Sequence, residues 1–383
     1  RRPRPRPDRF ARGGAAPAAL VLAPTRELAA QIHAEGRKLC NRSGLAPVVV
    51  YGGAKARPQL TELAMGVDVL VATPGRLQDF CGRGLVVLAN VRFLVLDEAD
   101  RMLDMGFEPQ IRRLHGYMPP PKDRQTLMFS ATFPPEIQKL AAEFMKDYVW
   151  ISVGRVGSTV SSIKQVLVPA TNNKREKLGL LRKALAAGPK SERGEVGRTL
   201  VFVKKKHTAR WVSKQLSRGG GDGEDERVQS AEIHGDRSQA QRESALNAFR
   251  EGRVRVLVAT DVAARGLDIA GVKHVVNFDL ASTPDEFDSY VHRIGRTGRA
   301  GNEGLATSFY VPGHEAKVGC GRIAPRLMRL LVETKQDIPE WFRQLPEAQA
   351  GLKTGPGGRE RGEERDVRKR NSSQRTGGER RRR

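Results

Sequence analysis

The chain repeats one pattern along most of its length: a short apolar run, then polar residues, then a segment of helical period. Five such runs lie in the first part of the sequence, at Ala19–Ala23, Val48–Tyr51, Asp68–Ala72, Phe93–Leu96 and Thr126–Phe129. Six more follow, at Gln165–Val168, Thr199–Val203, Ala231–His234, Val254–Ala259, His274–Phe278 and Ala306–Val311. Short apolar strands that alternate with helices are typical of parallel sheets covered on both faces. We therefore predict an α/β protein with two such sheets, one from each series.

The stretch between the two series indicates where the domains divide. Residues 153–162 are rich in Gly and Ser and have no helical period, so we predict an interdomain linker there. The two domains are then expected at 15–152 and 163–345. Residues 1–14 and 346–383 are rich in Arg and Gly and have little to bury, so both are expected to be disordered.

The charge of the chain points to a polyanionic partner. Lys and Arg number 67 against 43 Asp and Glu, a formal net charge of +24. Residues 1–14 carry +5 and residues 351–383 carry +7, so about half of the excess lies on the domains themselves. Aromatic residues make up only 5% of the chain, which disfavours a surface that binds single strands by base stacking.

The cysteines and the apolar runs exclude several other classes. Cys40, Cys81 and Cys320 are scattered without a C-x-x-C pair, which argues against a disulfide framework or a zinc site and fits a reducing compartment. No apolar run approaches the roughly 18 residues needed to span a bilayer, so we expect no membrane association.

Polar clusters directly follow the first five strands. They are Pro24–Glu27, Gly52–Gly53, Thr73–Arg76, Asp97–Glu98 and Ser130–Thr132. Open α/β sheets bind ligands at the carboxyl ends of their strands, where these clusters are expected. One cluster alone has an ordinary interpretation as turn chemistry, but five at equivalent positions favour a binding edge.

The run Val95–Asp100 has the most specific chemistry. An apolar strand that ends in Asp-Glu is how nucleotide-hydrolysing folds present a magnesium ligand and a group that activates water. The alternative is an acidic helix start, because Asp and Glu favour the first turn of a helix. The downstream run His292–Arg299, with several arginines, favours the nucleotide interpretation.

These motifs together resemble the DEAD-box RNA helicases of superfamily two. The matching segments are Ala23–Gln31, Thr73–Arg76, Val95–Asp100, Ser130–Thr132, Leu257–Asp268 and Tyr290–Gly298. Met105–Arg112 and Ile338–Phe342 resemble the Vasa/Belle-like subgroup. The resemblance covers roughly residues 18–345 and implies two tandem RecA-like domains, each a mostly parallel sheet with helices on both faces.

The resemblance implies catalytic roles, with ATP and Mg²⁺ as cofactors. Asp97 would hold Mg²⁺ and Glu98 would orient and deprotonate the attacking water. Arg293 and Arg296 would reach the γ-phosphate as arginine fingers, and Asp268 would bind the ribose hydroxyls.

A second set of residues would couple the nucleotide to RNA, namely Asp100, Ser130, Thr132 and His292. For Ser130 and Thr132 a helix cap remains the alternative.

RNA is the partner that the resemblance implies. Contacts would go to phosphates and 2′-hydroxyls rather than to base edges, because an unwinding enzyme must accept any sequence. The residues expected to make them are Pro24, Thr25, Arg26, Gly53, Thr73, Gly75, Arg76, Arg237, Gln239, Arg242, Thr260 and Arg265.

The sequence departs from the family pattern in two places. No G-x-x-x-x-G-K-[ST] phosphate loop occurs, and the family's adenine-reading glutamine motif is absent. In relatives both lie upstream of the segment that matches Pro24–Gln31, so we expect an amino-terminally truncated sequence of an active enzyme whose first domain folds poorly as written. Lys205 stands where relatives usually have a Thr that contacts RNA.

Three functions stay open on the sequence alone. The leading one is an ATP-dependent RNA helicase that clamps RNA, opens short duplexes or remodels ribonucleoproteins. The alternatives are an ATP-independent RNA-binding protein derived from a helicase, and a DNA helicase or annealing factor. We expect a monomer with ribonucleoprotein or translation factors as partners, in the cytoplasm, with nuclear shuttling as the alternative.

Overall fold

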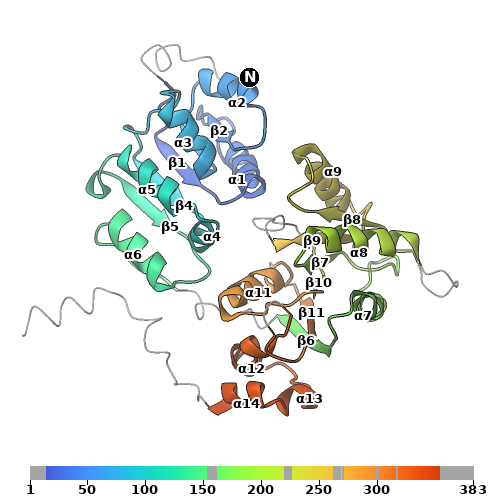
Figure 1. Ribbon diagram of the computed structural model, residues 1–383. Coiled ribbons are helices and arrows are strands. Elements are labelled where there is room, and N and C mark those ends of the chain that lie inside the picture. The colour runs from blue at the N-terminus through green and yellow to red at the C-terminus, as the bar shows by residue number, and fades with distance from the viewer. Residues whose placement is uncertain are drawn as a thin grey trace, which may run out of the picture. The chain divides into compact units, whose positions relative to one another are not determined.

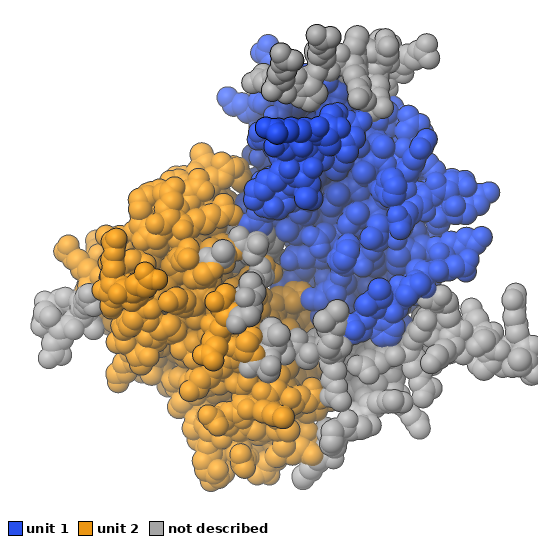
Figure 2. Space-filling view, turned by 180° about the vertical axis from the view of Figure 1, so that it is seen from behind, with its two compact units in different colours: residues 1–156, 359–383 blue, residues 157–358 orange. Residues whose placement is uncertain are grey.

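A computed structural model describes residues 14–152, 162–219, 227–261, 269, 271–298, 302–315 and 318–353. These residues form two compact units, one within residues 14–152 and one within residues 162–353, which are coloured separately in Figure 2. Of the predicted linker 153–162, residues 153–161 lie outside the described residues.

The first unit contains a five-stranded parallel sheet in the order β2-β3-β1-β4-β5. Its strands are β1 Ala19–Leu22, β2 Pro47–Val50, β3 Val69–Ala72, β4 Phe93–Leu96 and β5 Gln125–Met128. Its helices are α1 Arg26–Leu39, α2 Ala56–Ala64, α3 Pro74–Gly82, α4 Ala99–Asp104, α5 Glu108–Gly116 and α6 Pro135–Phe144, with a 3-10 turn η2 at Pro121–Asp123 (Figure 1).

The second unit contains a six-stranded parallel sheet in the order β6-β11-β10-β7-β9-β8. Its strands are β6 Ile163–Pro169, β7 Thr199–Val203, β8 Ser230–Ile233, β9 Val256–Thr260, β10 His274–Asn277 and β11 Gly304–Tyr310. Its helices include α7 Lys174–Ala187, α8 Lys206–Arg218, α9 Gln239–Arg250, α11 Phe287–Ile294, α12 Ala324–Glu333, α13 Glu340–Arg343 and α14 Pro346–Lys353, with 3-10 turns η3 Pro284–Glu286 and η4 Gly321–Ile323.

The central strands of the second sheet, β7, β9 and β10, are buried on both faces, as their apolar runs predict. Along β7, Val201 and Val203 pack into one hydrophobic cluster of the second unit. Leu200 and Phe202 pack into another, on the face that α9 covers. Successive side chains of a strand point to opposite faces, so a strand between two helical layers must be apolar throughout. All eleven predicted strands are present, and the two tandem α/β domains are confirmed.

The prediction that the chain is disordered from residue 346 is wrong for its first eight residues. Helix α14, Pro346–Lys353, packs on α12, with Ala348 fully buried. A Cβ atom on Gly351 would lie 2.4 Å from the carbonyl oxygen of Pro325, so the two backbones approach closely. A helix held by such close contact needs no wide aliphatic stripe. The predicted tail beyond residue 353 and residues 1–13 lie outside the described residues.

Candidate functional site

The paired carboxylates Asp97 and Glu98 lie at the carboxyl end of β4, as predicted. The amide of Asp97 donates to the carbonyl of Leu22 on β1, and the amide of Glu98 donates to Asp97 Oδ1 at 3.0 Å. Glu98 has φ 49° and ψ 54°, the left-handed conformation, at the N-cap of α4. Non-glycine residues in this region are strained and tend to occur at functional sites.

Burial raises the pKa of the Asp97 carboxyl above its usual range, and the neighbouring charges of Glu98 and Asp100 act in the same direction. A bound cation would relieve this unfavourable cluster of negative charge. Magnesium needs only one or two protein carboxylates beside substrate phosphates and water, so Asp97 fits it. The described residues contain no group of three or more His, Cys, Asp or Glu side chains arranged as a separate metal site.

Asp100 joins this acidic turn to the loop after β5. Its Oδ2 accepts hydrogen bonds from the Thr132 hydroxyl at 2.8 Å and the Thr132 amide at 2.9 Å. The Asp100 amide donates to Ser130 Oγ at 3.2 Å. The structure thus brings together three of the four predicted coupling residues. Ser130 also satisfies an amide in the first turn of α4, so the capping alternative describes part of its contacts.

Three loops after β1, β2 and β3 form one cluster at the same edge of the sheet. Thr25 caps α1, since its hydroxyl accepts from the Leu28 amide at 3.3 Å. Thr73 is the N-cap residue of α3, and its hydroxyl accepts from the Gly52 amide at 3.4 Å. Gly53 has φ +70°, and a Cβ there would lie 2.1 Å from Arg26 Nη1, so the Arg26 guanidinium lies directly against the Gly53 backbone.

The remaining predicted contacts of the first unit lie in the same cluster. Arg76 donates from Nη2 to the carbonyl of Ala54 at 3.1 Å, while its buried Nη1 has no hydrogen-bond partner among the described residues. Pro24 is buried at the end of β1, and the Cα of Gly75 faces open space at the start of α3. All seven residues predicted to bind RNA in this unit therefore lie in the loops, or at the helix starts, that follow β1, β2 and β3.

Arg293 is buried within the second unit. It is only 5% exposed, and its Nε and Nη2 donate to the two carboxylate oxygens of Asp261 at 2.6 and 2.5 Å. Its Nη1 donates to the carbonyl of Asp279 at 2.7 Å and to Asn277 Oδ1 at 3.4 Å. Burial alone would lower the pKa of Arg293, but the carboxylates of Asp261, Asp279 and Glu286 raise it. In this structure Arg293 is a buried cross-link within the second unit rather than a side chain extended toward a phosphate.

The other predicted residues of motif His292–Arg296 lie at the end of α11. His292 and Arg296 are both half-buried. Thr260, which ends β9, is buried and directly precedes the Asp261 carboxylate. Asp268 and Arg265, predicted to bind ribose and RNA, lie outside the described residues.

The predicted RNA residues that follow β8 lie at the start of α9. The guanidinium of Arg237 donates to the buried carboxylate of Glu232. Gln239 is the first residue of α9 and donates to Glu243 at 2.9 Å, and Arg242 lies one turn further along the helix.

Two polar residues, the half-buried Asp261 and the buried Gln59, were missed by sequence reasoning. Asp261 follows the strand Val256–Thr260 at its carboxyl end, the same position as Asp97 after β4, and this signal was available. Gln59 accepts from the Tyr51 amide at 3.0 Å and donates to the Tyr51 carbonyl at 3.1 Å, so it fixes the glycine turn after β2. No sequence motif marks Gln59, because it lies on helix α2, several residues after the turn whose backbone it binds.

Comparison with known families agrees with this site. The family model for the DEAD/DEAH box helicase matches residues 8–140, and the one for the helicase conserved C-terminal domain matches residues 176–301. Together they span the first sheet and strands β7 to β10 of the second, with the motifs that these strands carry. The chain belongs to the DEAD-box helicase family.

Solved structures of the yeast S. cerevisiae protein Dbp5 are similar to this chain. One, bound to RNA and ADP BeF3, is 31% identical with a TM-score of 0.66, over 81% of this chain and 74% of its own. A variant of that protein with the same ligands is 29% identical with a TM-score of 0.68, over 87% and 78%. A further structure, with a Gle1 variant and IP6, is 31% identical with a TM-score of 0.58, over 78% and 72%.

No helix in the described part of the chain has both the length and the apolar character needed to cross a membrane.

Proposed function

We propose that this chain is the catalytic core of an ATP-dependent RNA helicase that clamps single-stranded RNA and opens short duplexes or remodels ribonucleoproteins. Family membership and the binding of RNA and ADP BeF3 by the similar yeast protein support this proposal. Within that family we propose the Vasa/Belle-like subgroup, on the segments 105–112 and 338–342. A monomer, translation or ribonucleoprotein factors as partners, and a cytoplasmic site of action remain part of the proposal.

The observation that carries the proposal is the contact of Asp100 with Ser130 and Thr132. It places the turn holding Asp97 and Glu98 in direct contact with a second loop through buried, charge-assisted hydrogen bonds. A change at the acidic turn would therefore be transmitted to the loop after β5. An RNA-binding protein without ATPase activity has no need of such a junction.

The RNA-binding part of the proposal rests on the loops after β1, β2 and β3. Arg26 and Arg76 lie among threonine hydroxyls and glycine amides, a set of donors suited to phosphate oxygens. The buried Arg76 Nη1, which has no partner among the described residues, is a donor that a phosphate would satisfy. RNA rather than DNA is proposed because the similar yeast protein binds RNA.

The phosphate-binding loop needs a separate proposal, since no G-x-x-x-x-G-K-[ST] occurs in the 383 residues. We place it in an additional segment of the protein that pairs with β5. Strand β5 is the last strand of its sheet among the described residues, and Leu127 and Phe129 beside that edge are 37% and 54% exposed. An apolar strand edge is normally covered, so this one is suited to a further strand.

Bound ATP and Mg²⁺ would supply the phosphoanhydride bond and the charge that polarises it. Asp97 would hold the metal, and Glu98 would orient the water and accept its proton. Arg296 is the candidate for phosphate contact from the second unit, while Arg293 acts as a positioning residue through Asp261. Lys205, the N-cap residue of α8, would contact an RNA phosphate as a point charge.

The test is the substitution Glu98→Gln in the protein with its upstream reading frame included. We expect RNA-stimulated ATPase to be lost while ATP-dependent retention of RNA persists, because glutamine keeps the shape but cannot accept a proton. Glu136→Gln, on the exposed start of α6, is the matched control and should leave both unchanged. ATP turnover near the wild-type rate in Glu98→Gln would exclude the assigned role.

The alternative is an RNA-binding protein that does not use ATP. Sequencing the transcript upstream of this reading frame distinguishes the two. A strand followed by G-x-x-x-x-G-K-[ST] supports the enzyme, whereas a start codon without that loop favours the binding protein. In the second case RNA affinity would be the same with and without ATP.

A further inference from the structure

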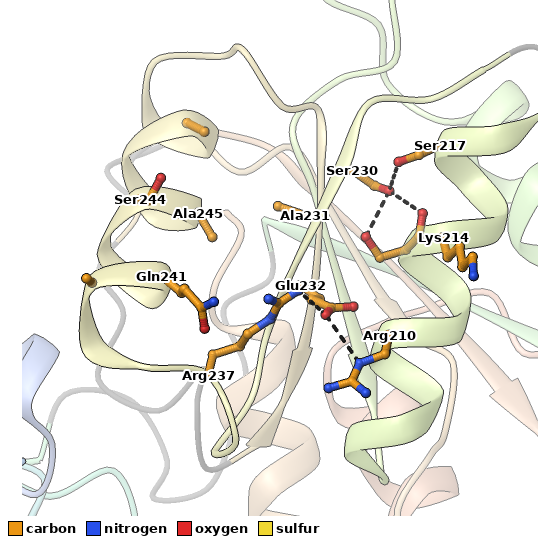
Figure 3. Close-up of a pocket in the computed structure, with 13 residues that line it drawn as sticks. Arg210, Lys214, Ser217, Ser230, Ala231, Glu232, Arg237, Gln241, Ser244 and Ala245 are labelled. Atoms are coloured by element: carbon orange, nitrogen blue, oxygen red, sulfur yellow. Dashed lines mark hydrogen bonds and ion pairs between the residues drawn. The ribbon is translucent and has the colours of Figure 1, made fainter.

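A groove of about 680 Å³ runs beside strand β8, between helices α8 and α9 of the second unit (Figure 3). Its lining includes neither Arg293 nor Asp261. Its lining is made almost entirely of small and polar side chains: Arg210, Ser213, Lys214, Ser217, Ser230, Ala231, Glu232, Arg237, Ala240, Gln241, Ser244, Ala245 and Ala248. No aromatic residue is among them.

Small side chains line the floor of the groove. Ser230 on β8 lies within 3.2 and 2.9 Å of the hydroxyls of Ser213 and Ser217, and it donates to the carbonyl of Ser213 at 2.8 Å. On the other side, Ala231 and Ala245 pack against the apolar cluster beneath α9. The small side chains at these positions let an incoming backbone approach the strand closely.

Strand β8 presents an edge to this groove. It pairs with β9 only, and among the described residues it is the last strand of its sheet. Helix α8 covers the face of Ser230 and Glu232, and α9 covers the face of Ala231, so the edge itself is what remains open. Exposed strand edges pair readily with another extended segment, and several peptide-binding domains work in this way.

The charges of the groove favour an acidic occupant. Arg210, Lys214 and Arg237 lie on its walls against the single carboxylate of Glu232. Glu232 is 8% exposed and is already compensated by Arg237 and by Arg210, whose Nε is 3.8 Å from Glu232 Oε1. Lys214 is exposed and makes no ion pair with any of the described residues. The net charge left for a partner is positive.

The spacing of the basic residues matches that of an extended chain. Arg210 and Lys214 are four residues apart on α8, a rise of about 6 Å at 1.5 Å per residue. Side chains at alternate positions of a strand lie about 6.6–6.8 Å apart on one face. Carboxylates at positions i and i+2 of a peptide paired with β8 would therefore meet the two cations in register.

RNA fits this groove less well than a peptide does. No aromatic side chain lines the groove, so none is available for stacking a base. The free N–H and C=O groups of a strand edge pair with the backbone of another polypeptide strand. A nucleic acid has no backbone that can form this regular pattern of hydrogen bonds.

We propose that this groove, between α8 and α9, binds an extended segment of a partner protein as an added strand beside β8, with Asp or Glu at alternate positions facing Arg210 and Lys214. This proposal does not depend on the helicase function. The segment would be held by backbone hydrogen bonds along β8 and selected by its carboxylates.

The experiment is a selection of random dodecapeptides displayed on phage against the full chain, followed by titration of the enriched peptides. Enriched sequences should carry acidic residues at alternate positions and should slow amide hydrogen exchange at Ser230–Ile233. Ser244→Trp, which fills the groove from the exposed side of α9, should weaken their binding at least about tenfold. Asn247→Trp, three residues along the same helix and outside the groove, should leave it unchanged.

A charge reversal tests the electrostatic part separately. Lys214→Glu should weaken the acidic peptides about tenfold, whereas Lys183→Glu, the same change on exposed α7, should not. Enrichment of no peptide, or equal binding to the wild type and Ser244→Trp, would overturn the proposal. So would loss of decauridylate RNA affinity in Ser244→Trp with intact peptide binding, because the groove would then belong to the RNA surface.

Discussion

Replacing Arg293 by lysine separates its structural role from a direct contact with phosphate. The substitution keeps the positive charge but removes the planar group that donates to both oxygens of Asp261. A lysine ammonium can satisfy one of these acceptors or the carbonyl of Asp279, but not all of them at once. If Arg293 is a buried cross-link, the stability of the second unit must fall.

The expected loss can be estimated from burial. Removing one partner of a buried ion pair costs about 3–5 kcal/mol, because the other charge is left without compensation. The Asp261 side chain is 26% exposed, so water can reach it, and the lysine retains its charge. Both points favour the lower end, about 3 kcal/mol. At about 2–4 °C per kcal/mol for a domain of this size, the second unit should melt about 6–12 °C lower.

The assay is thermal unfolding of the full chain, followed by tryptophan fluorescence. Trp211 and Trp341 report on the second unit and Trp150 on the first, so a selective shift can be assigned by removing one reporter at a time. Arg296→Lys is the matched control and should melt within about 2 °C of the wild type. If Arg293→Lys also melts within that range, the cross-link contributes nothing and the reasoning is refuted.

Three further outcomes follow from particular contacts. Thr132→Val removes the hydroxyl bound to Asp100 at 2.8 Å but keeps the amide bond at 2.9 Å, so unfolding of the first unit in urea should become easier by about 1–2 kcal/mol; an unchanged midpoint would contradict it. Gly53→Ala places a Cβ against Arg26 at a positive φ, so stability should fall by about 1–2 kcal/mol and RNA affinity should fall with it in a filter-binding assay. Burial lowers the pKa of His274 from 6.5 to about 4. Between these pH values the unfolded chain binds a proton that the folded chain does not, so the free energy of unfolding should decrease as the pH falls from 6.5 to about 4. His274→Asn should flatten this dependence of the urea midpoint on pH, and an equally steep slope would assign it to other groups.

Most of the fold could be predicted from the sequence because both sheets are parallel and their central strands are largely buried. Such strands must be apolar without interruption, and strands such as β7 and β9 are buried at every residue. Strand ends were less predictable, as in β11, which starts at Gly304 rather than Ala306. Pairing with β6 extends it there, and neighbouring strands rather than its own sequence decide this.

Helix α14 could not be predicted for a related reason. Its sequence has few aliphatic residues. A buried helix is recognised in a sequence by a periodic apolar face, which this segment lacks. What holds this helix is the close approach of Gly351 to the backbone of Pro325 on α12. Contact of this kind depends on the absence of a side chain, so composition alone makes the segment look disordered.

The candidate site was predictable where it lies directly after a strand, and not where it depends on a distant partner. The loops containing Thr25, Thr73 and Asp97 are positioned by the sheet itself, since the ends of adjacent parallel strands meet at one edge. The role of Arg293 depends on Asp261, thirty-two residues earlier and on another loop. Nothing in the sequence around Arg293 distinguishes an arginine that points into the domain from one that points out.

The burial of Arg293 affects the positions of its neighbours His292 and Arg296. Successive residues of an α-helix are rotated by about 100°, so Arg293 and His292 cannot face the same direction. Because Arg293 is anchored inward by Asp261, Asn277 and Asp279, the rotation of α11 about its own axis is fixed. His292 and the turn that carries Arg296 are thereby held in one orientation at the end of the helix. Loss of Arg293 should therefore impair any function of Arg296, even if Arg293 makes no direct contact with the ligand. Measuring both stability and activity in Arg293→Lys and in Arg296→Lys separates this indirect effect from a direct contact.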